Sequence, residues 1–404
     1  MNDQELRKMI NPSYSTGKGC LLLQMGSGDP VILKIGEMID ISEIRGKSNA
    51  MEADPTLAEI SKTYAIGNYA RYNIWERLVE QTDCDVIVDL PCGYLPHGIF
   101  AAKAGKQYYG FDLPVVIDEF KPAMEKICGN DPAIHIAAVD ATNYDSMKQA
   151  LKGAKGKLCI IMDGLLGFFN PSELKEVCTA IKSLLSEYGG VWYTPDALSG
   201  KMMTLCYEAL WQKDSKILEQ VMHAGSGSAA QIDNSINPFV SFSYDEKKKL
   251  MEEQGFAVRE IPWSEIIGDL PQTDPAMMKR IRQNYAKMFE WKLTVKEKSV
   301  TTASDDDFSV TVTRSGDTTA YEIRGRLDTI HAPELMHAFE NAVKTEKIVI
   351  NAKNMEYISS SGLRVLLVMR KSVKDNSCLR VQGCSDAVKE IFEVTGFDSM
   401  FEIV

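Results

Sequence analysis

Short apolar runs alternate with longer amphipathic stretches through the middle of the chain. The apolar runs end at polar turns and predict five buried strands, at 86–90, 108–112, 134–140, 157–163 and 189–195. Between the last two, residues 171–189 repeat apolar positions such as Leu174, Val177 and Ile181 at helical spacing. This alternation predicts an α/β fold of the Rossmann-like, doubly wound kind, in which helices cover both faces of a mostly parallel sheet.

The pattern changes on both sides of this region. Residues 51–84 show an apolar and aromatic helical face, so we expect a helix that covers the sheet or its pocket. Residues 1–50 are poorly periodic, with an expected hairpin around Gly26-Ser27-Gly28-Asp29. Residues 296–306 are charged and rich in Ser and Thr, as is typical of a linker. We therefore expect an N-terminal extension (1–50), a main domain (51–295), the linker (296–306) and a second domain (307–404).

The second domain is most informative at residues 347–371, which predict a smaller α/β unit. An apolar strand at 348–350 precedes a polar turn, and Ser359-Ser360-Ser361-Gly362 then opens a helix with an apolar face. A helix start leaves backbone N–H groups unpaired and carries partial positive charge. A hydroxyl group there either caps the helix or accepts a phosphate, and the pattern is compatible with both roles.

Composition narrows the functional classes. The net charge of −11 over 404 residues argues against nucleic acid as a partner, because there is no basic excess to neutralise phosphates. No apolar run is long enough to span a membrane. The nine cysteines form no Cys-x-x-Cys pair, which favours reduced thiols and a cytoplasmic location. The five histidines do not pair with cysteines at zinc spacing, so we expect no metal site.

Four of the expected strands end in an acid: Asp89, Asp112, Asp140 and Asp163. The carboxyl ends of parallel strands form one edge of a sheet, where ligands of such folds bind. Asp112 follows Asp89 at the spacing at which an acid of a nucleotide-binding unit reaches ribose hydroxyls. The alternative, which stays open, is that the four acids only solvate strand ends and cap helices.

This layout resembles that of class I S-adenosylmethionine-dependent methyltransferases. Residues 50–265 are similar, more narrowly, to the leucine carboxyl methyltransferase family. Four segments carry the resemblance: VIVDLPCGYLPHG (86–98), KQYYGFDLPVVI (106–117), IHIAAVDATN (134–143) and KLCIIMDGLLGFF (157–169). The chain departs from the usual Gly-x-Gly turn at Pro91-Cys92-Gly93, where proline removes one N–H donor, and at Leu95.

The resemblance implies how S-adenosylmethionine would bind. Asp112 would hold the ribose diol, Asp140 would accept from the adenine amino group, Gly93 would let the backbone approach the methionine part, and Arg71 would pair with its carboxylate. The full implied set is Arg71, Asp89, Gly93, Asp112, Leu113, Asp140, Ala141, Asp163 and Gly164. Methyl transfer to a small-molecule or protein acceptor needs alignment more than side-chain chemistry, so no catalytic residue is assigned. His97 is a lone candidate acid or base.

The second domain resembles the STAS family, the domain of anti-sigma-factor antagonists. The matching pieces are YEIRGRLDT (321–329), the helix from Ala332, the serine turn and the tail DAVKEIFEVTGFDSMFEI (386–403). The family's turn reads Asp-Ser-Ser-Gly, so the phosphorylated serine corresponds to Ser360, and Ser359 replaces the aspartate. The resemblance implies an anti-sigma factor or serine-kinase-type partner that contacts Asp328, Ser359 and Ser361.

Two functions remain open. In the first, the STAS module signals under control of serine phosphorylation while the main domain binds S-adenosylmethionine. In the second, the main domain is an active O- or carboxyl methyltransferase and the STAS module regulates or docks it. Gly225-Ser226-Gly227-Ser228 resembles a nucleophile elbow only superficially, because no apolar strand precedes it, and we expect a loop there.

Overall fold

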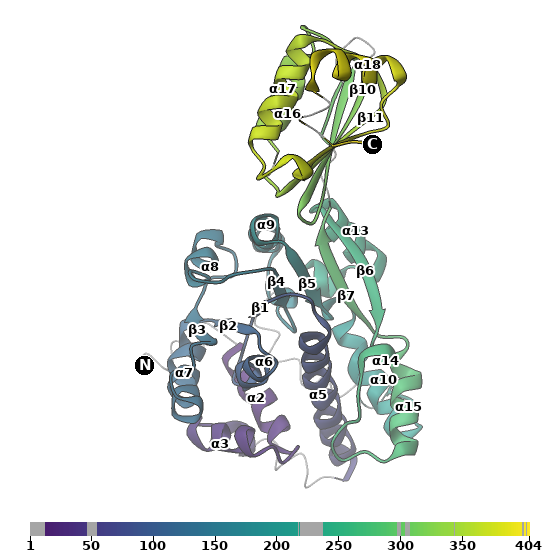
Figure 1. Cartoon of the computed structure of the whole chain (residues 1–404). Coiled ribbons are helices and arrows are strands. Elements are labelled where there is room, and N and C mark those ends of the chain that lie inside the picture. Colours follow the sequence, from purple (N-terminus) through teal and green to yellow (C-terminus); the bar gives the residue numbers. More distant parts are fainter. Residues whose placement is uncertain are drawn as a thin grey trace. The chain divides into compact units, whose positions relative to one another are not determined.

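The computed structural model describes residues 13–46, 55–216, 218, 237–296, 300–303, 308–342, 344–397, 400 and 402–404. The chain divides into two compact units, 1–295 and 296–404 (Figure 1). The segment 225–228 lies outside the described residues, as do parts of the expected extension and linker. No helix among the described residues is long and apolar enough to cross a membrane.

The first unit contains a seven-stranded sheet in the order β3-β2-β1-β4-β5-β7-β6. Its strands are β1 (Val86–Asp89), β2 (Gln107–Asp112), β3 (Ile134–Ala138), β4 (Leu158–Ile161), β5 (Gly190–Thr194), β6 (Phe256–Pro262) and β7 (Phe289–Val295). Strands β1 to β5 pair in parallel, whereas β7 is antiparallel to both β5 and β6. The expected doubly wound, mostly parallel sheet is therefore confirmed.

Alternate residues of each strand face opposite sides of the sheet, and helices cover both. Ile87 and Ile161 belong to one hydrophobic core, whereas Val88 and Ile160 belong to the other. The first core packs against α5 (Pro55–Gln81), α6 (His97–Lys103), α7 (Pro114–Cys128), α10 (Ser199–Trp211), α14 (Trp263–Ile266) and α15 (Pro275–Tyr285). The second packs against α8 (Tyr144–Ala150), α9 (Pro171–Tyr188), α12 (Pro238–Ser241) and α13 (Tyr244–Glu253).

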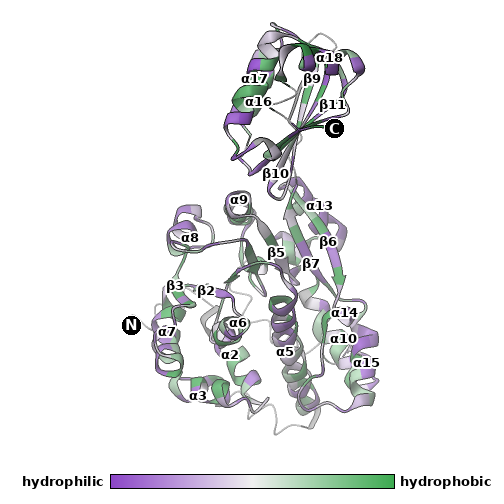
Figure 2. Ribbon diagram, viewed as in Figure 1, coloured by the Kyte–Doolittle hydropathy of each residue, from purple (hydrophilic) through white to green (hydrophobic). Residues whose placement is uncertain are grey.

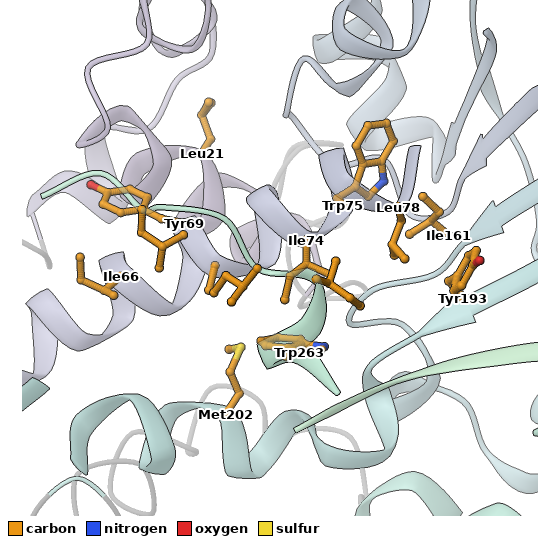
Figure 3. Packing of buried hydrophobic residues seen from close by; sticks show 14 of the residues in the cluster. Leu21, Ile66, Tyr69, Ile74, Trp75, Leu78, Ile161, Tyr193, Met202 and Trp263 are labelled. Atoms are coloured by element: carbon orange, nitrogen blue, oxygen red, sulfur yellow. The ribbon is translucent and has the colours of Figure 1, made fainter. Parts of the chain in front are cut away.

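Helix α5 lies at the centre of the first core. Figure 3 shows its residues Tyr69, Ile74 and Trp75 among side chains from other elements, including Leu21 and Trp263. The expected helix over 51–84 is thus present from residue 55 to 81. Because its apolar side is almost completely buried, α5 holds one wall of the sheet's ligand edge in place.

The expected hairpin around Gly26–Asp29 is wrong. The segment connects two helices, α2 (Ser13–Met25) and α3 (Pro30–Met38), which pack on the first core through Leu21, Ile32 and Ile35. The Asp29 side chain accepts hydrogen bonds from the N–H groups of Val31 and Ile32, and Pro30 occupies the first turn, so Asp-Pro is a helix start here. The N-terminal segment belongs to the first unit.

The second unit is a six-stranded sheet in the order β13-β12-β11-β10-β9-β8. Its elements are β8 (Val300–Ala303), β9 (Ser309–Ser315), β10 (Thr318–Leu327), α16 (Ala332–Glu340), β11 (Lys347–Ile358), α17 (Ser360–Lys371), η4 (Asn376–Cys378), β12 (Leu379–Gln382), α18 (Asp386–Thr395) and β13 (Glu402–Ile403). Figure 2 shows that α17 is hydrophobic over much of its length, which suits its place over this sheet's core. Strand β8 lies inside the expected linker and pairs with β9.

The polar turn expected after residue 350 is also wrong, because β11 continues to Ile358. It pairs with β10 over this length through two register shifts. Burial of Ala352, Met355 and Ile358 provides the apolar contacts that keep the polar stretch extended. The long strand brings the serine turn directly beside the end of β10, where Ser359 N–H donates to Leu327 O at 3.0 Å.

Candidate functional site

A cavity of about 500 Å³ lies at the carboxyl ends of β1, β2 and β4 in the first unit. Chain connections leave β1 and β4 toward opposite edges of the sheet, which makes this the switch point where ligands of such folds bind. All nine residues implied to bind the cofactor line this cavity: Arg71, Asp89, Gly93, Asp112, Leu113, Asp140, Ala141, Asp163 and Gly164. Its volume is in the range of small-molecule sites.

Asp112 joins the end of β2 to the turn after β1. Gly93 N–H donates to its Oδ2 at 2.9 Å, and Leu113 N–H donates to its Oδ1 at 2.7 Å. Burial raises the pKa of Asp112 to about 6, although both N–H groups act to lower it. Gly93 has φ of 55°, a conformation that other residues adopt at a cost. Each carboxylate oxygen keeps lone-pair capacity for a ligand.

Asp140 lies further along the same edge and is exposed. Its Oδ1 accepts from Thr142 N–H at 2.9 Å and from Thr142 Oγ1 at 2.7 Å, which fixes a turn before α8. Apolar side chains of Leu113, Val139 and Ala141 line the cavity between Asp112 and Asp140. Two carboxylates separated by an apolar surface can hold a flat ring whose ends are polar.

Arg71 on α5 and Asp163 after β4 form an ion pair across the cavity wall. The Arg71 Nε lies 2.9 Å from Asp163 Oδ2, and its Nη2 lies 2.8 Å from Oδ1. Burial is the largest single effect and lowers the pKa of Arg71, but Asp163, Cys20 and Asp196 together outweigh it and raise that pKa. We expected Arg71 to pair with a cofactor carboxylate; two of its three nitrogens instead contact Asp163.

Another acid, Asp196, holds the loop after Asp163 and was not anticipated from the sequence. Its carboxylate accepts three backbone N–H groups, from Gly164 at 2.7 Å, Leu165 at 2.9 Å and Leu166 at 2.7 Å. It is almost fully buried, and this burial raises its pKa to about 6. Its place two residues after β5 is the signal that could have identified it.

We expect Asp196→Asn to destabilise the protein by about 1–3 kcal/mol, because the amide leaves buried N–H groups facing an N–H donor. Urea denaturation at neutral pH measures the change. Asp145→Asn, an exposed substitution in the first turn of α8, is the matched control and should leave the free energy of unfolding nearly unchanged. Equal effects of the two substitutions would contradict this role of Asp196.

The Asp89 carboxylate forms its hydrogen bonds within a buried cluster of side chains. Its Oδ2 lies 2.7 Å from His97 Nδ1 and accepts from the Tyr108 hydroxyl at 2.8 Å, and its Oδ1 accepts from Trp75 Nε1 at 3.3 Å. The His97 ring stacks on Trp75, with 4.0 Å between ring centroids and 7° between planes. His97 also lines the cavity, so its position at the start of α6 is compatible with a chemical role.

The N-terminal helices supply a cavity wall that the sequence pattern did not indicate. Thr16, Gly17 and Cys20 of α2 line the cavity. Lys18 is almost fully buried and joins α2 to α7, because its Nζ lies 2.9 Å from Glu119 Oε2. Tyr94, in the turn after β1, donates to the same Glu119 oxygen at 3.1 Å.

The serine turn of the second unit separates its three hydroxyls. Ser359 is buried and caps α17, since its Oγ accepts from Gly362 N–H at 3.3 Å. Ser360 is exposed and Ser361 is half-buried. A Cβ on Gly362 would lie 2.8 Å from Leu327 O, so glycine permits the close packing of α17 on β10. Serine caps a helix about as well as aspartate, so Ser359 preserves the local structure of the turn.

Asp328 lies close to this turn. Its Oδ1 accepts from Ile330 N–H at 2.9 Å and from His331 N–H at 3.2 Å, which fixes the loop before α16. Ile330 is 75% exposed, a large apolar side chain beside an acid on the surface. The structure thus brings Asp328 and the serine turn together at one end of the second unit, through the contact between Ser359 and Leu327.

Comparison with known proteins assigns the second unit. The STAS domain family model matches residues 309–404. A STAS-domain containing protein of Pseudomonas aeruginosa is 29% identical over 84 residues, which span 20% of this chain and 83% of the relative. An anti-sigma-B factor antagonist of Staphylococcus aureus is 30% identical over 88 residues, which span 20% of this chain and 82% of the relative.

The first unit is similar in structure to O-methyltransferases. An O-methyltransferase family protein from Burkholderia thailandensis aligns with 66% of this chain and 71% of its own, at 11% identity and a TM-score of 0.33.

Proposed function

We propose that this chain, which belongs to the STAS family through residues 309–404, is a two-domain signalling protein. Its first domain binds S-adenosylmethionine in the cavity at the ends of β1, β2 and β4. Its STAS domain docks on an anti-sigma factor or serine-kinase-type protein, and phosphorylation of Ser360 controls that contact.

One observation carries the first half of the proposal: the nine residues chosen from sequence line a single cavity. The residues fit the nucleoside. Asp112 presents a fixed carboxylate for the ribose diol, and the apolar surface from Leu113 to Ala141 suits the adenine ring beside Asp140. When bound, the cofactor would supply an activated methyl group. The chain would orient it through Asp112 and the turn at Gly93 and exclude water through the α2 wall.

Calorimetric titration of S-adenosylmethionine into the full chain tests this binding. We expect a saturable heat and an increase in the melting temperature, because a ligand that binds the folded state stabilises it. S-adenosylhomocysteine should compete. The absence of both heat and thermal shift would remove the cofactor from the proposal.

The second half depends on the exposure of Ser360 at the start of α17. A phosphate there would add roughly −1.5 to −2 charges beside Asp328 at neutral pH. The name of the Staphylococcus aureus relative, an anti-sigma-B factor antagonist, suggests the class of partner. The added negative charge is sufficient to weaken a contact with an acidic partner through repulsion and to strengthen one with a basic partner through attraction.

We expect a serine kinase of the anti-sigma type to phosphorylate the full chain at Ser360. Intact-mass and peptide mass spectrometry measure the product. Ser360→Ala should lose the phosphate, whereas Ser361→Ala, the neighbouring half-buried hydroxyl, should retain it. Phosphate that persists in Ser360→Ala would reassign the site, and its absence from the unaltered chain would refute the switch.

A second candidate function is methyl transfer by the first domain, with the STAS domain as a regulatory or docking module. The pairing of His97 with Asp89 beside the cavity favours it, because an imidazole held in one orientation next to a ligand can take part in proton transfer.

A further inference from the structure

We propose that His97, oriented by Asp89, accepts the proton of the molecule that is methylated, and that this molecule is a hydroxyl compound of the phenol class rather than a carboxylate. The inference rests on the proposed binding of S-adenosylmethionine in the same cavity.

The position of His97 supports a base. Its ring is fixed on one face by the stacked Trp75, and Tyr72 approaches it at a tilt with 5.0 Å between centroids. Its Nδ1 lies 2.7 Å from Asp89 Oδ2. The ring can neither slide nor turn over without breaking these contacts, so it is pre-organised as a positioned proton acceptor requires.

The contacts of Asp89 also determine the tautomer. Asp89 receives hydrogen bonds from Trp75 and Tyr108, and an ionised carboxylate can only accept. In the neutral ring, His97 Nδ1 therefore carries the hydrogen that it donates to Asp89, and the lone pair lies on Nε2. When Nε2 gains a proton, the adjacent carboxylate stabilises the positive charge.

Nε2 has no hydrogen-bond partner among the described residues, although it is buried. An unpaired buried acceptor costs about 1–3 kcal/mol. Asn68 Oδ1 is also a buried acceptor without a hydrogen-bond partner among the described residues. Asn68 lies on α5 and lines the same cavity. A ligand hydroxyl that donates to Nε2 would satisfy the histidine, whereas a carboxylate has no hydrogen to donate and would meet the charge of Asp89.

The step balances without another reactant. Nε2 takes the hydroxyl proton while the hydroxyl oxygen forms its bond to the methyl carbon. The electron pair of the broken carbon–sulfur bond stays on sulfur, which leaves as a neutral thioether. The imidazolium then releases its proton to water when the product leaves. A carboxylate acceptor is already ionised and would make no use of this base.

Other titratable groups surround His97. Asp89 lies on β1, and the hydroxyl of Tyr108 on β2 donates a hydrogen bond to it. Tyr72 and Glu76, both on α5, lie near the His97 ring. Burial raises the pKa of Tyr72 and that of Glu76. Burial also raises the pKa of Tyr108, so Tyr72 and Tyr108 both stay protonated at neutral pH and neither accepts the proton that the bound molecule loses.

The test uses the full chain saturated with S-adenosylhomocysteine, which cannot transfer a methyl group, and 4-nitrophenol as the probe. At pH 7, where part of the free probe is still protonated and the Asp112 carboxylate is ionised, we expect binding to increase the yellow phenolate absorbance. His97→Gln should reduce this increase at least tenfold. His135→Gln, which removes an exposed histidine stacked on Tyr109 outside the cavity, should leave it unchanged. 4-Nitrobenzoate should not displace the probe.

A phenolate increase that persists in His97→Gln, displacement by 4-nitrobenzoate, or no such increase in the unaltered chain would each overturn the proposal. If the variant fails to fold, nitrogen-15 histidine spectra of the unaltered chain decide, because one of its five histidines must become protonated as the probe binds. The cofactor is tested separately by calorimetry. If S-adenosylmethionine binds but no proton is transferred, the role of His97 as a base is refuted and the cofactor assignment stands. If a proton is transferred but S-adenosylmethionine does not bind, the cofactor assignment is refuted and the role of His97 stands.

Discussion

Replacement of Asp112 by alanine should weaken S-adenosylmethionine binding by about 100-fold or more. Hydrogen bonds to a charged group contribute about 1.5–3 kcal/mol each, and a ribose diol offers two. The substitution also frees Gly93 N–H and Leu113 N–H, which Asp112 now orients. Calorimetry on the full chain gives the dissociation constant, and Asp145→Ala on exposed α8 is the matched control.

The same carboxylate predicts a pH dependence. Burial raises the pKa of Asp112 to about 6, and only the ionised form can accept from both ribose hydroxyls. Affinity should therefore be full above about pH 7 and fall as the pH decreases through 6. Asp112→Asn should bind weakly at all pH values without this transition. Unchanged affinity in Asp112→Ala would refute the ribose assignment.

Replacement of Arg71 by alanine should lower the free energy of unfolding by about 2–4 kcal/mol, because it leaves a partly buried carboxylate without its partner. The uncompensated group is Asp163, and two further buried acids, Asp196 and Glu290, interact electrostatically with it. Burial raises the pKa of Glu290 as well. Urea denaturation, followed through the transition of the first unit, measures the loss.

Two comparisons make the Arg71 result specific. Arg282→Ala removes an exposed ion pair with Asp269, at 2.9 Å, and should change stability little. The double substitution Arg71→Ala/Asp163→Asn should recover part of the loss, since the unpaired charge is gone. If Arg71→Ala costs no more than Arg282→Ala, the pair does not stabilise the loop after β4.

Strands β1, β2, β4 and β5 were predictable because each is a short apolar run buried on both faces, whereas the edge strand β3 is only partly buried. Val86–Asp89 and Leu158–Ile161 have no exposed position. A strand that is buried on both faces appears in the sequence as a continuous apolar run. The acids at the strand ends followed from the same reasoning, because parallel strands present their carboxyl ends at one edge.

The features that the sequence did not reveal depend on residues that lie far apart in it. Arg71 and Asp163 are separated by 92 positions, and no local pattern connects them. The polar second half of β11 is a strand because β10 supplies its hydrogen bonds, not because its residues favour one. Helix α2 lacks a clear apolar period, and it contacts both α3 and α5.

The contacts between α2 and α7 set the minimum length of a fragment that keeps the cavity wall. Lys18 and Tyr94 share one oxygen of Glu119, and a Cβ on Gly17 would lie 3.2 Å from the Tyr94 ring. A protein trimmed to begin at residue 51 would keep every strand and every acid of the ligand edge, yet it would lack this wall and admit solvent beside the turn at Gly93. Anyone who cuts the chain to crystallise the first unit with a nucleoside should therefore leave residues 13–38 attached.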